Sequence, residues 1–266
     1  MEISRKEFLD NYVNLDLGGC NGNLYMDLSN QESMSRVIKI FKSSYRMENR
    51  EKTLDYLMSF SKIIGSGYPL EKLYLDGQLW GYISDYFKNS FSFNSSMVMN
   101  RTFYEKIKAS RDVDSQLREI YKRNIIFHDI NCGNLLIDSN GGHIIDFEDV
   151  LIPDALVEPY SLYGLRFEKR PIVASKKLDQ LKLLISVFSL LYIYDIERYF
   201  ISNKDISKLL EFVKDDEVLY EFVSDCLSCI NDKGRDTLPY LSEVLDNIDE
   251  DKIYDGRSRV RNLLYK

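Results

Sequence analysis

The stretch IIFHDINCGNLLIDSNGGHIIDFEDV (125–150) places polar groups at the ends of short apolar runs. The runs IIF and HIIDF have the composition of strands, and a Gly-Gly turn lies just before the second run. Each run ends in a carboxylate, Asp129 or Asp146, and the amide of Asn134 lies between them. Buried groups of this kind cost folding free energy unless they bind a partner. We therefore expect a strand–loop–strand hairpin that brings the three side chains together.

These three side chains have the chemistry of a magnesium site with a proton acceptor beside it. Carboxylate and amide oxygens are the hard donors that Mg²⁺ prefers. The ion takes few ligands from a protein because water and phosphate fill the rest of its coordination shell. A carboxylate that stays off the metal can accept a proton from a hydroxyl group.

Two features upstream suit the binding of phosphate. The segment LGGCNGNLY (17–25) places Gly18, Gly19 and Gly22 between two β-like runs. Glycines let backbone N–H groups approach phosphate oxygens without interference from a Cβ atom. In RVIKIFK (36–42), Lys39 alternates with isoleucines inside an apolar strand, so we expect its side chain to face the inner side of the sheet and meet a phosphate there.

The character of the chain changes from strand to helix near residues 87–95. The first ninety residues contain short β-like runs, one helical pattern at 46–64, and an Asp76-Gly77 hairpin signal. Most of the chain after residue 95 has helical spacing, interrupted by the strands of the 125–150 stretch. This order predicts an α+β fold with a β-rich first part and a mostly helical second part.

In this order, the features resemble the protein-kinase-like superfamily, which includes eukaryotic-type protein kinases and the aminoglycoside and choline kinases. The family's catalytic Asp, followed five residues later by Asn, matches Asp129 and Asn134 in DINCGN. Its metal-binding Asp-Phe-Gly matches Asp146 in DFE, and its strand lysine matches Lys39 in RVIK. The resemblance implies that Asn134 and Asp146 bind Mg²⁺. It further implies that Lys39 contacts the α- and β-phosphates of ATP and that Asp129 acts as the base or orients the hydroxyl.

The family also has a bilobal fold, which implies a small β-rich N-lobe with one helix at residues 1–87 and a larger, mostly helical C-lobe at residues 88–266. The chain resembles a divergent, bacterial-type member. In the family, a glutamate on the helix after the strand lysine pairs with that lysine. Glu51 is our choice for this residue because an apolar helical stripe follows it, and Glu48 is held in reserve.

Two further positions follow from the resemblance. The linker after β-like WGYISDYF resembles the family's hinge, so the backbone of Asp85, Tyr86 and Phe87 is expected to meet adenine. Asp179, in KLDQLKLL, resembles the buried aspartate that opens the central helix of the C-lobe and supports the catalytic loop.

Departures from the family pattern concentrate around the same residues. Leu17 stands at the first position of the glycine motif, whereas Gly19 and Gly22 fit its last two glycines. In the catalytic loop and beside the metal aspartate, the residues that differ from the commonest protein-kinase pattern are Phe127, His128, Asn131 and Glu148. Glu148 replaces the glycine after Phe147, as in some small-molecule kinases.

Composition limits the partners and the location that we expect. The net charge is −7, from 35 basic and 42 acidic residues, which argues against a general nucleic-acid binder. The first residues lack the apolar core of a signal peptide, and the longest apolar run (181–194) is too short to cross a bilayer. The four cysteines suggest a reduced compartment. We expect a cytoplasmic protein that binds neither nucleic acid nor membrane; the sequence leaves its oligomeric state open.

The expected activity is transfer of phosphate from ATP, with Mg²⁺, to an alcohol group. A Ser/Thr-type protein substrate is favoured, because the 33 positions from Asp146 to Asp179 leave room for a protein-kinase-type activation segment. The first alternative is a small-molecule kinase of the aminoglycoside or choline type, which Gly133 and Glu148 favour. A catalytically weak pseudokinase that acts as a nucleotide-binding regulator is the second alternative, and nucleotidyl transfer is the third.

Overall fold

The computed structural model of the protein describes residues 1–15, 22–27, 35–41, 47–153, 165–167, 170–172 and 174–265. The chain forms two compact units: Met1–Asn89 with Ile145–Ala155, and Ser90–Ile144 with Leu156–Lys266. The sequence placed a division between residues 87 and 88 and did not anticipate that a later segment returns to the first unit. Strands predominate in the first unit and helices in the second, so the predicted mixture of helix and strand is confirmed for the described residues.

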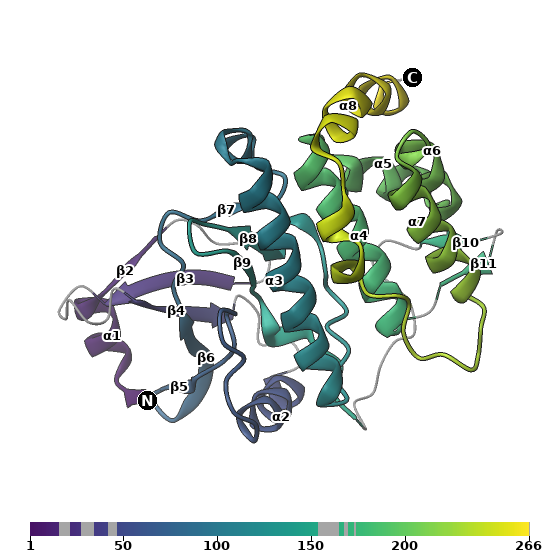
Figure 1. The fold of residues 1–266 in the computed structure, drawn as a ribbon. Helices are drawn as coiled ribbons and strands as arrows, with labels where there is room; N and C mark the ends of the chain where they lie inside the picture. The colour runs from purple at the N-terminus through teal and green to yellow at the C-terminus, as the bar shows by residue number, and fades with distance from the viewer. Residues whose placement is uncertain are drawn as a thin grey trace. The chain divides into compact units, whose positions relative to one another are not determined.

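A six-stranded sheet with the strand order β1-β5-β6-β4-β3-β2 forms the first unit (Figure 1). Neighbouring strands are antiparallel except β1 and β5, which are parallel. The strands are β1 (Glu2–Ile3), β2 (Tyr12–Asn14), β3 (Gly22–Asp27), β4 (Arg36–Phe41), β5 (Glu71–Leu75) and β6 (Gln78–Asp85). The helices α1 (Arg5–Asn11) and α2 (Met47–Met58) and the short helix η4 (Phe147–Asp149) belong to the same unit.

The turn between β5 and β6 is the Asp76-Gly77 turn that the sequence predicts. Both residues have positive φ, 50° for Asp76 and 76° for Gly77. A two-residue hairpin of type I′ needs positive φ at both positions, and Asp-Gly provides it at low cost. Leu75 pairs with Gln78 directly across the turn, so the predicted hairpin is confirmed.

Alternation along β4 sends successive side chains to opposite faces of the sheet. Ile38 belongs to a core cluster that includes Phe8 of α1. Phe41 belongs to a second cluster that includes Leu54 of α2. Because Lys39 has the same parity as Phe41, its side chain lies on the face of the sheet that packs against α2.

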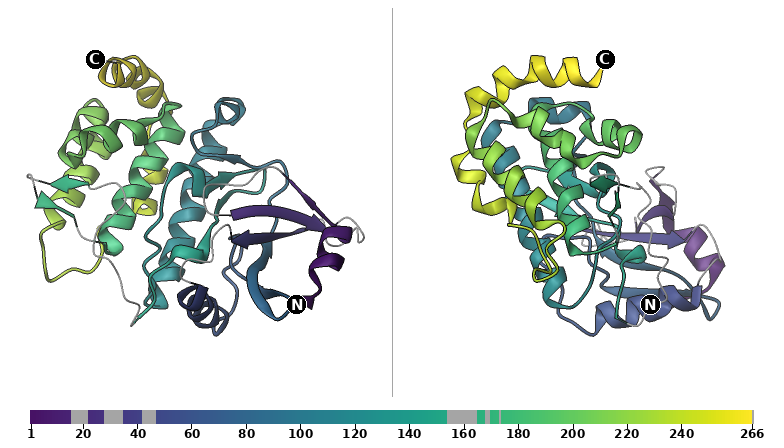
Figure 2. Two further views of the ribbon diagram at one scale, coloured as in Figure 1. Left: turned by 180° about the vertical axis from the view of Figure 1, so that it is seen from behind. Right: turned by 90° about the vertical axis from the view of Figure 1, so that its right-hand side faces the viewer.

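The second unit is mostly helical, and α4 lies at its centre. The helices are α3 (Phe103–Lys122), α4 (Lys176–Tyr192), α5 (Ile196–Asn203), α6 (Leu209–Val213), α7 (Glu217–Cys229) and α8 (Glu250–Leu264). α4 is buried along nearly its whole length because it packs against α3, α5 and α8 (Figure 2). Within the described ranges, no helix has both the length and the apolar character needed to cross a membrane.

Short elements complete the second unit. They are β7 (Phe91–Ser92), β8 (Leu135–Ile137), β9 (Gly142–Ile144), β10 (Arg166–Phe167), β11 (Arg170–Pro171), η2 (Ser96–Asn100), η3 (Cys132–Asn134), η5 (Ile206–Lys208), η6 (Leu241–Glu243) and η7 (Leu245–Asn247). The expected hairpin is present with a different first strand. β8 pairs with β9, whereas residues 125–127 belong to none of the named strands. The run LLI forms the first strand because it directly precedes the short turn before β9. A short turn can join β9 only to the segment just before it, and IIF lies too far upstream.

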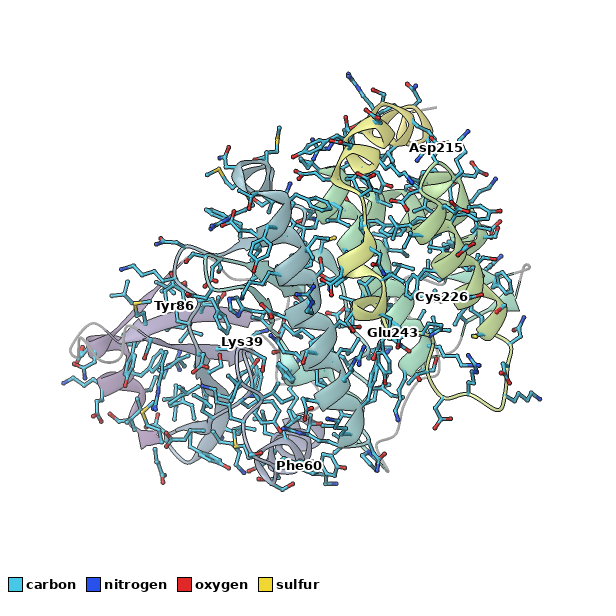
Figure 3. All side chains as sticks on the ribbon, in the orientation of Figure 1. Lys39, Phe60, Tyr86, Asp215, Cys226 and Glu243 are labelled. Carbon is cyan, nitrogen blue, oxygen red and sulfur yellow. The ribbon has the colours of Figure 1, made fainter. Side chains whose placement is uncertain are left out.

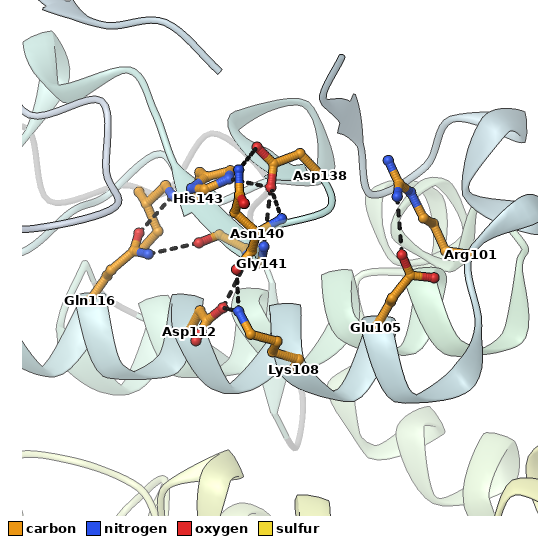
Figure 4. A network of polar contacts seen from close by, with 11 residues as sticks. Arg101, Glu105, Lys108, Asp112, Gln116, Asp138, Asn140, Gly141 and His143 are labelled. Carbon is orange, nitrogen blue, oxygen red and sulfur yellow. Dashed lines mark hydrogen bonds and ion pairs between the residues drawn. The ribbon is translucent and has the colours of Figure 1, made fainter. Parts of the chain in front are cut away.

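Side chains of α3 fix the β8–β9 hairpin in place (Figure 4). Gln116 donates to the backbone oxygen of Gly142 at 2.7 Å and accepts from the N–H of Ile144 at 2.8 Å. The Asp138 carboxylate caps the turn by accepting from the N–H groups of Asn140 and Gly141. Gln116 thus provides hydrogen-bond partners for two backbone groups of β9, an N–H and a C=O, that pair with no other strand among the described residues. These bonds hold the strand that precedes Asp146.

We predict that Gly81→Ala destabilises the first unit. A Cβ atom at Gly81 would lie 1.9 Å from the backbone oxygen of Lys39, so β6 could not keep its distance from β4. Overpacking of this kind costs about 1–3 kcal/mol. Urea unfolding measures the loss. Gly234→Ala is the matched control, because its nearest atom is a side-chain oxygen of Asp232 at 3.2 Å. Equal midpoints for Gly81→Ala and wild type would contradict the β4–β6 packing.

Candidate functional site

The loop at residues 127–134, in the second unit, brings Asp129 and Asn134 into direct contact. Asn134 Nδ2 donates to the backbone oxygen and to Oδ2 of Asp129, both at 2.9 Å. Asn131 Nδ2 donates to Oδ1 of Asp129 at 3.2 Å, so each carboxylate oxygen of Asp129 accepts from an amide. Because Asn134 donates through its nitrogen, its side-chain oxygen is left to accept from a donor or to bind a cation.

Asn131 organises this loop, a role that sequence reasoning missed. Its Oδ1 accepts from the N–H groups of Gly133 at 2.8 Å and Asn134 at 3.2 Å. An Asn side chain that caps the following turn in this way favours a compact loop. The signal was present in the sequence as Asn two residues before Gly, but Asn131 was noted only as a departure from the kinase pattern.

Asp179 anchors the start of the loop from the first turn of α4. Its Oδ2 accepts from the N–H of Phe127 at 2.7 Å, and its Oδ1 accepts from the N–H of His128 at 3.0 Å. The carboxylate is 1% exposed, so the expected support of the loop by a buried aspartate is confirmed. His128 has φ of 68°, a left-handed conformation that is costly for a residue with a Cβ atom. The two bonds to Asp179 help to hold that conformation.

Lys182, one helical turn after Asp179, supplies a buried positive charge. Its Nζ donates to the backbone oxygen of His128. Burial raises the pKa of Asp179 to about 7, against the opposing effects of Lys182 and of the two N–H donors. Burial likewise lowers the pKa of Lys182, and the charges of Asp179 and Asp129 oppose that shift. Each group therefore offsets part of the other's cost of burial.

In the first unit, Lys39 meets two carboxylates of the segment that follows β9. Lys39 Nζ contacts Oδ1 of Asp146 and lies 2.7 Å from Oε2 of Glu148. The exposed fractions of the side chains are 11% for Lys39, 22% for Asp146 and 1% for Glu148, so the contact with Glu148 is the more buried one. Burial lowers the pKa of Lys39, and Glu148 opposes that shift.

Asp146 is held in an unusual backbone conformation. Its φ of 76° and ψ of 62° lie in the left-handed region. For a non-glycine residue this costs on the order of 1–3 kcal/mol, and such strain concentrates at functional sites. The next residue, Phe147, is fully buried, and its ring lies 5.3 Å from that of Tyr68 in a T-shaped contact. This packing fixes the segment that presents Asp146 to Lys39.

The predicted pairing of Lys39 with Glu51 is wrong in this structure. Glu51 Oε1 accepts from the Tyr74 hydroxyl at 2.6 Å and lies 3.3 Å from Lys72 Nζ. The physical reason is that Lys72 and Tyr74 on β5 already engage Glu51, and Glu148 already neutralises Lys39. The side chain of the reserve candidate, Glu48, lies outside the described residues.

The predicted nucleotide-binding residues are described only in part. Gly18 and Gly19 lie outside the described residues, and Gly22 is the first residue of β3. Asp85 ends β6, and its carboxylate lies 2.5 Å from Lys62 Nζ. The N–H of Tyr86 donates to the backbone oxygen of Ser35 at 2.8 Å, so that donor is already engaged. Figure 3 labels Lys39 and Tyr86 in the first unit.

Phe87, the third residue of the expected hinge, follows Tyr86 outside the named strands. Sequence reasoning missed Tyr82 as a site residue. Tyr82 is the direct cross-strand partner of Lys39 in the β4–β6 pair. Its hydroxyl donates to Oε2 of Glu148 at 3.1 Å. Burial, reinforced by the charge of Glu148, raises its pKa well above the usual value, so the hydroxyl keeps its proton.

The two predicted metal ligands have side-chain oxygens of the kind that magnesium prefers. Asn134 has a side-chain oxygen to offer, and Asp146 has a partly exposed carboxylate; both are donor types that Mg²⁺ prefers. In the parts of the chain that the structure describes, no three or more His, Cys, Asp or Glu side chains are grouped so that they could hold a metal. Asn134 belongs to the second unit and Asp146 to the first, and each is described by itself.

No protein-family model matches the chain, and no curated protein matches it.

We predict that Asp179→Asn destabilises the protein and that the loss depends on pH. The amide offers one oxygen where two N–H groups need acceptors, and an unsatisfied buried donor costs about 1–3 kcal/mol. Burial raises the folded-state pKa of Asp179 to about 7, above its unfolded value near 4. Its stabilising contribution is then complete below about pH 4 and is lost as the pH rises through about 7.

The measurement is urea unfolding of wild type and Asp179→Asn at several values between pH 5 and pH 8. The stability difference between the two proteins should be larger at pH 5 than at pH 8. A difference that grows toward pH 8 would contradict the assigned direction of the shift.

Proposed function

We propose that the protein is an ATP- and Mg²⁺-dependent phosphotransferase with a bilobal, protein-kinase-like fold. The observation that carries the proposal is the ion pair between Lys39 and Asp146 in the first unit. A strand lysine there meets an aspartate 107 residues later in the sequence. This combination matches the phosphate-binding lysine and metal-binding aspartate of that superfamily. The Asp129–Asn134 contact, with Asp179 supporting its loop, gives independent support from the second unit.

Each of these residues has a defined task in such a reaction. Mg²⁺, when bound, neutralises charge on the transferring phosphoryl group. Asn134 and Asp146 would hold it through side-chain oxygens, and Lys39 would bind phosphate oxygens with its ammonium group. Asp129 orients the acceptor hydroxyl and accepts its proton at a carboxylate oxygen. The amides of Asn131 and Asn134 keep that carboxylate in one orientation, which reduces reorganisation during the reaction.

A protein hydroxyl is the acceptor that we favour, on the length of chain between Asp146 and Asp179. Part of that segment, residues 154–164, lies outside the described residues. His128 stands where many protein kinases carry an arginine that pairs with a phosphorylated loop, so control by loop phosphorylation is not part of the proposal. Incubation with a protein mixture, compared with aminoglycosides and with choline, separates the two acceptor classes.

A nucleotide-binding regulator without turnover is the second candidate, and one observation favours it. Lys39 contacts two carboxylates at once, and the one from Glu148 is almost fully buried. The ammonium group of Lys39 has to leave Asp146 before it can bind a phosphate, and separating an ion pair that is largely buried is costly. ATP binding measured by thermal shift, without turnover on any acceptor, would support this candidate.

We predict that Asp129→Asn and Asp146→Asn lower phosphate transfer from ATP by about 10²-fold or more, because each removes a charge on which the reaction depends. The assay follows transfer to acceptor or hydrolysis of ATP by the purified proteins. Glu119→Gln is the control, since Glu119 is a partly exposed carboxylate of α3 that pairs with Lys122. Full activity of folded Asp146→Asn would rule out the proposed reaction.

Mass spectrometry after incubation with Mg·ATP separates the candidate reactions. We expect the protein, or a protein acceptor added to it, to gain the mass of a phosphate group. A gain of the mass of AMP would instead indicate nucleotidyl transfer. An unchanged mass in every acceptor mixture, together with ATP binding, would support the regulator.

A further inference from the structure

We propose that Glu148 positions Lys39, and that it does so in place of a glutamate from helix α2. This inference rests on the proposed phosphotransferase function, because its consequence concerns the phosphate-binding lysine. It departs from the pattern that the kinase resemblance implied, in which Glu51 would hold Lys39. All of the residues involved belong to the first unit.

A single oxygen of Glu148 contacts both Lys39 and Tyr82. Oε2 of Glu148 lies 2.7 Å from Lys39 Nζ and accepts from the Tyr82 hydroxyl at 3.1 Å. Lys39 and Tyr82 are directly opposite each other on β4 and β6, so their side chains leave the same face of the sheet. One carboxylate oxygen thus joins two neighbouring donors, and the rigid sheet fixes both donors in position.

The burial of Glu148 favours a functional role over a purely structural one. Glu148 is 3% exposed, and its other oxygen, Oε1, is buried without a hydrogen-bond partner in the described residues. A buried acceptor left unsatisfied costs free energy that a well-packed apolar side chain would avoid. The carboxylate of Glu148 offsets that cost by keeping the neighbouring Lys39 charged and oriented.

The helix residue expected in this role is engaged elsewhere. Glu51 binds Lys72 and Tyr74, both on β5. Lys72 also lies 2.7 Å from Asp55, so this contact fastens two turns of α2 to an outer part of the sheet. The ion pairs of α2 therefore stabilise its packing on β5 and do not include Lys39.

A regulatory consequence follows from this exchange of partners. Glu148 and Asp146 are two residues apart, and both contact the ammonium group of Lys39. One short segment, residues 146–149, thus holds the lysine and also carries the metal-binding aspartate. Displacing this segment would release both groups together, whereas a displacement of α2 would leave the ion pairs of Lys39 intact.

The first test is a pair of double-mutant cycles read from urea unfolding midpoints, which needs no activity. Lys39→Met with Glu148→Gln should shift the midpoint by less than the two single shifts added together, because the same pair is lost only once. Lys39→Met with Glu51→Gln should be additive. Coupling of Lys39 to Glu51, with additivity for Glu148, overturns the inference.

The second test is steady-state kinetics with ATP. Glu148→Gln should lower kcat by about 10²-fold while the protein stays folded, because Lys39 loses the group that aims it at the phosphates. Glu148→Asp, which keeps the charge, should recover part of the loss, and Glu51→Gln should keep wild-type kcat. A loss with Glu51→Gln equal to that with Glu148→Gln overturns the inference. If wild type shows no turnover but Lys39 and Glu148 are coupled, the proposed function fails and the anchoring of Lys39 is supported.

Discussion

The ammonium group of Lys39, buried in the first unit, has to be neutralised by a carboxylate that also lies in the interior. Moving such a charge out of water is expensive unless an opposite charge and further hydrogen bonds meet it. Here the partners come from a segment more than a hundred residues later, so the pair ties residues 145–155 to the sheet. The membership of this segment in the first unit follows from that pairing and from the burial of Phe147 against Tyr68.

The second unit also contains buried groups of opposite charge, Asp179 and Lys182. Asp179 is buried because it must reach the N–H groups of two loop residues, and Lys182 supplies the nearby positive charge. In each unit buried charged side chains contact a short segment that contains a left-handed, non-glycine residue: Asp146 in the first unit, which pairs with Lys39, and His128 in the second, whose backbone bonds to Asp179 and Lys182. Strained backbone of this kind persists only where the surroundings over-determine it.

Several features were predictable because they depend on neighbours in the sequence. Asp76-Gly77 forms its hairpin turn because only two residues set its geometry. Asp129 and Asn134 meet because they are only five positions apart in one loop. Asp179 was predicted to be a buried residue that supports the loop, because it resembles an aspartate of the kinase family at the start of an apolar helix. Its hydrogen bonds to the loop backbone confirm this. The first strand of the hairpin was misassigned because IIF and LLI are both apolar and short, and composition alone does not decide which run pairs.

The sequence by itself determined the order of the elements, the alternation that turns Lys39 toward one face, and the local loop around Asp129. Only the tertiary structure decided which carboxylate neutralises Lys39. The sequence favoured Glu51, because an apolar helical stripe follows it, and did not indicate Glu148 as a partner. The choice depends on the pairing of β4 with β6, which places Tyr82 beside Lys39, and on β5, whose Lys72 and Tyr74 engage Glu51. Strand pairing joins residues far apart in the chain, and the free energy of a buried charge depends on those neighbours.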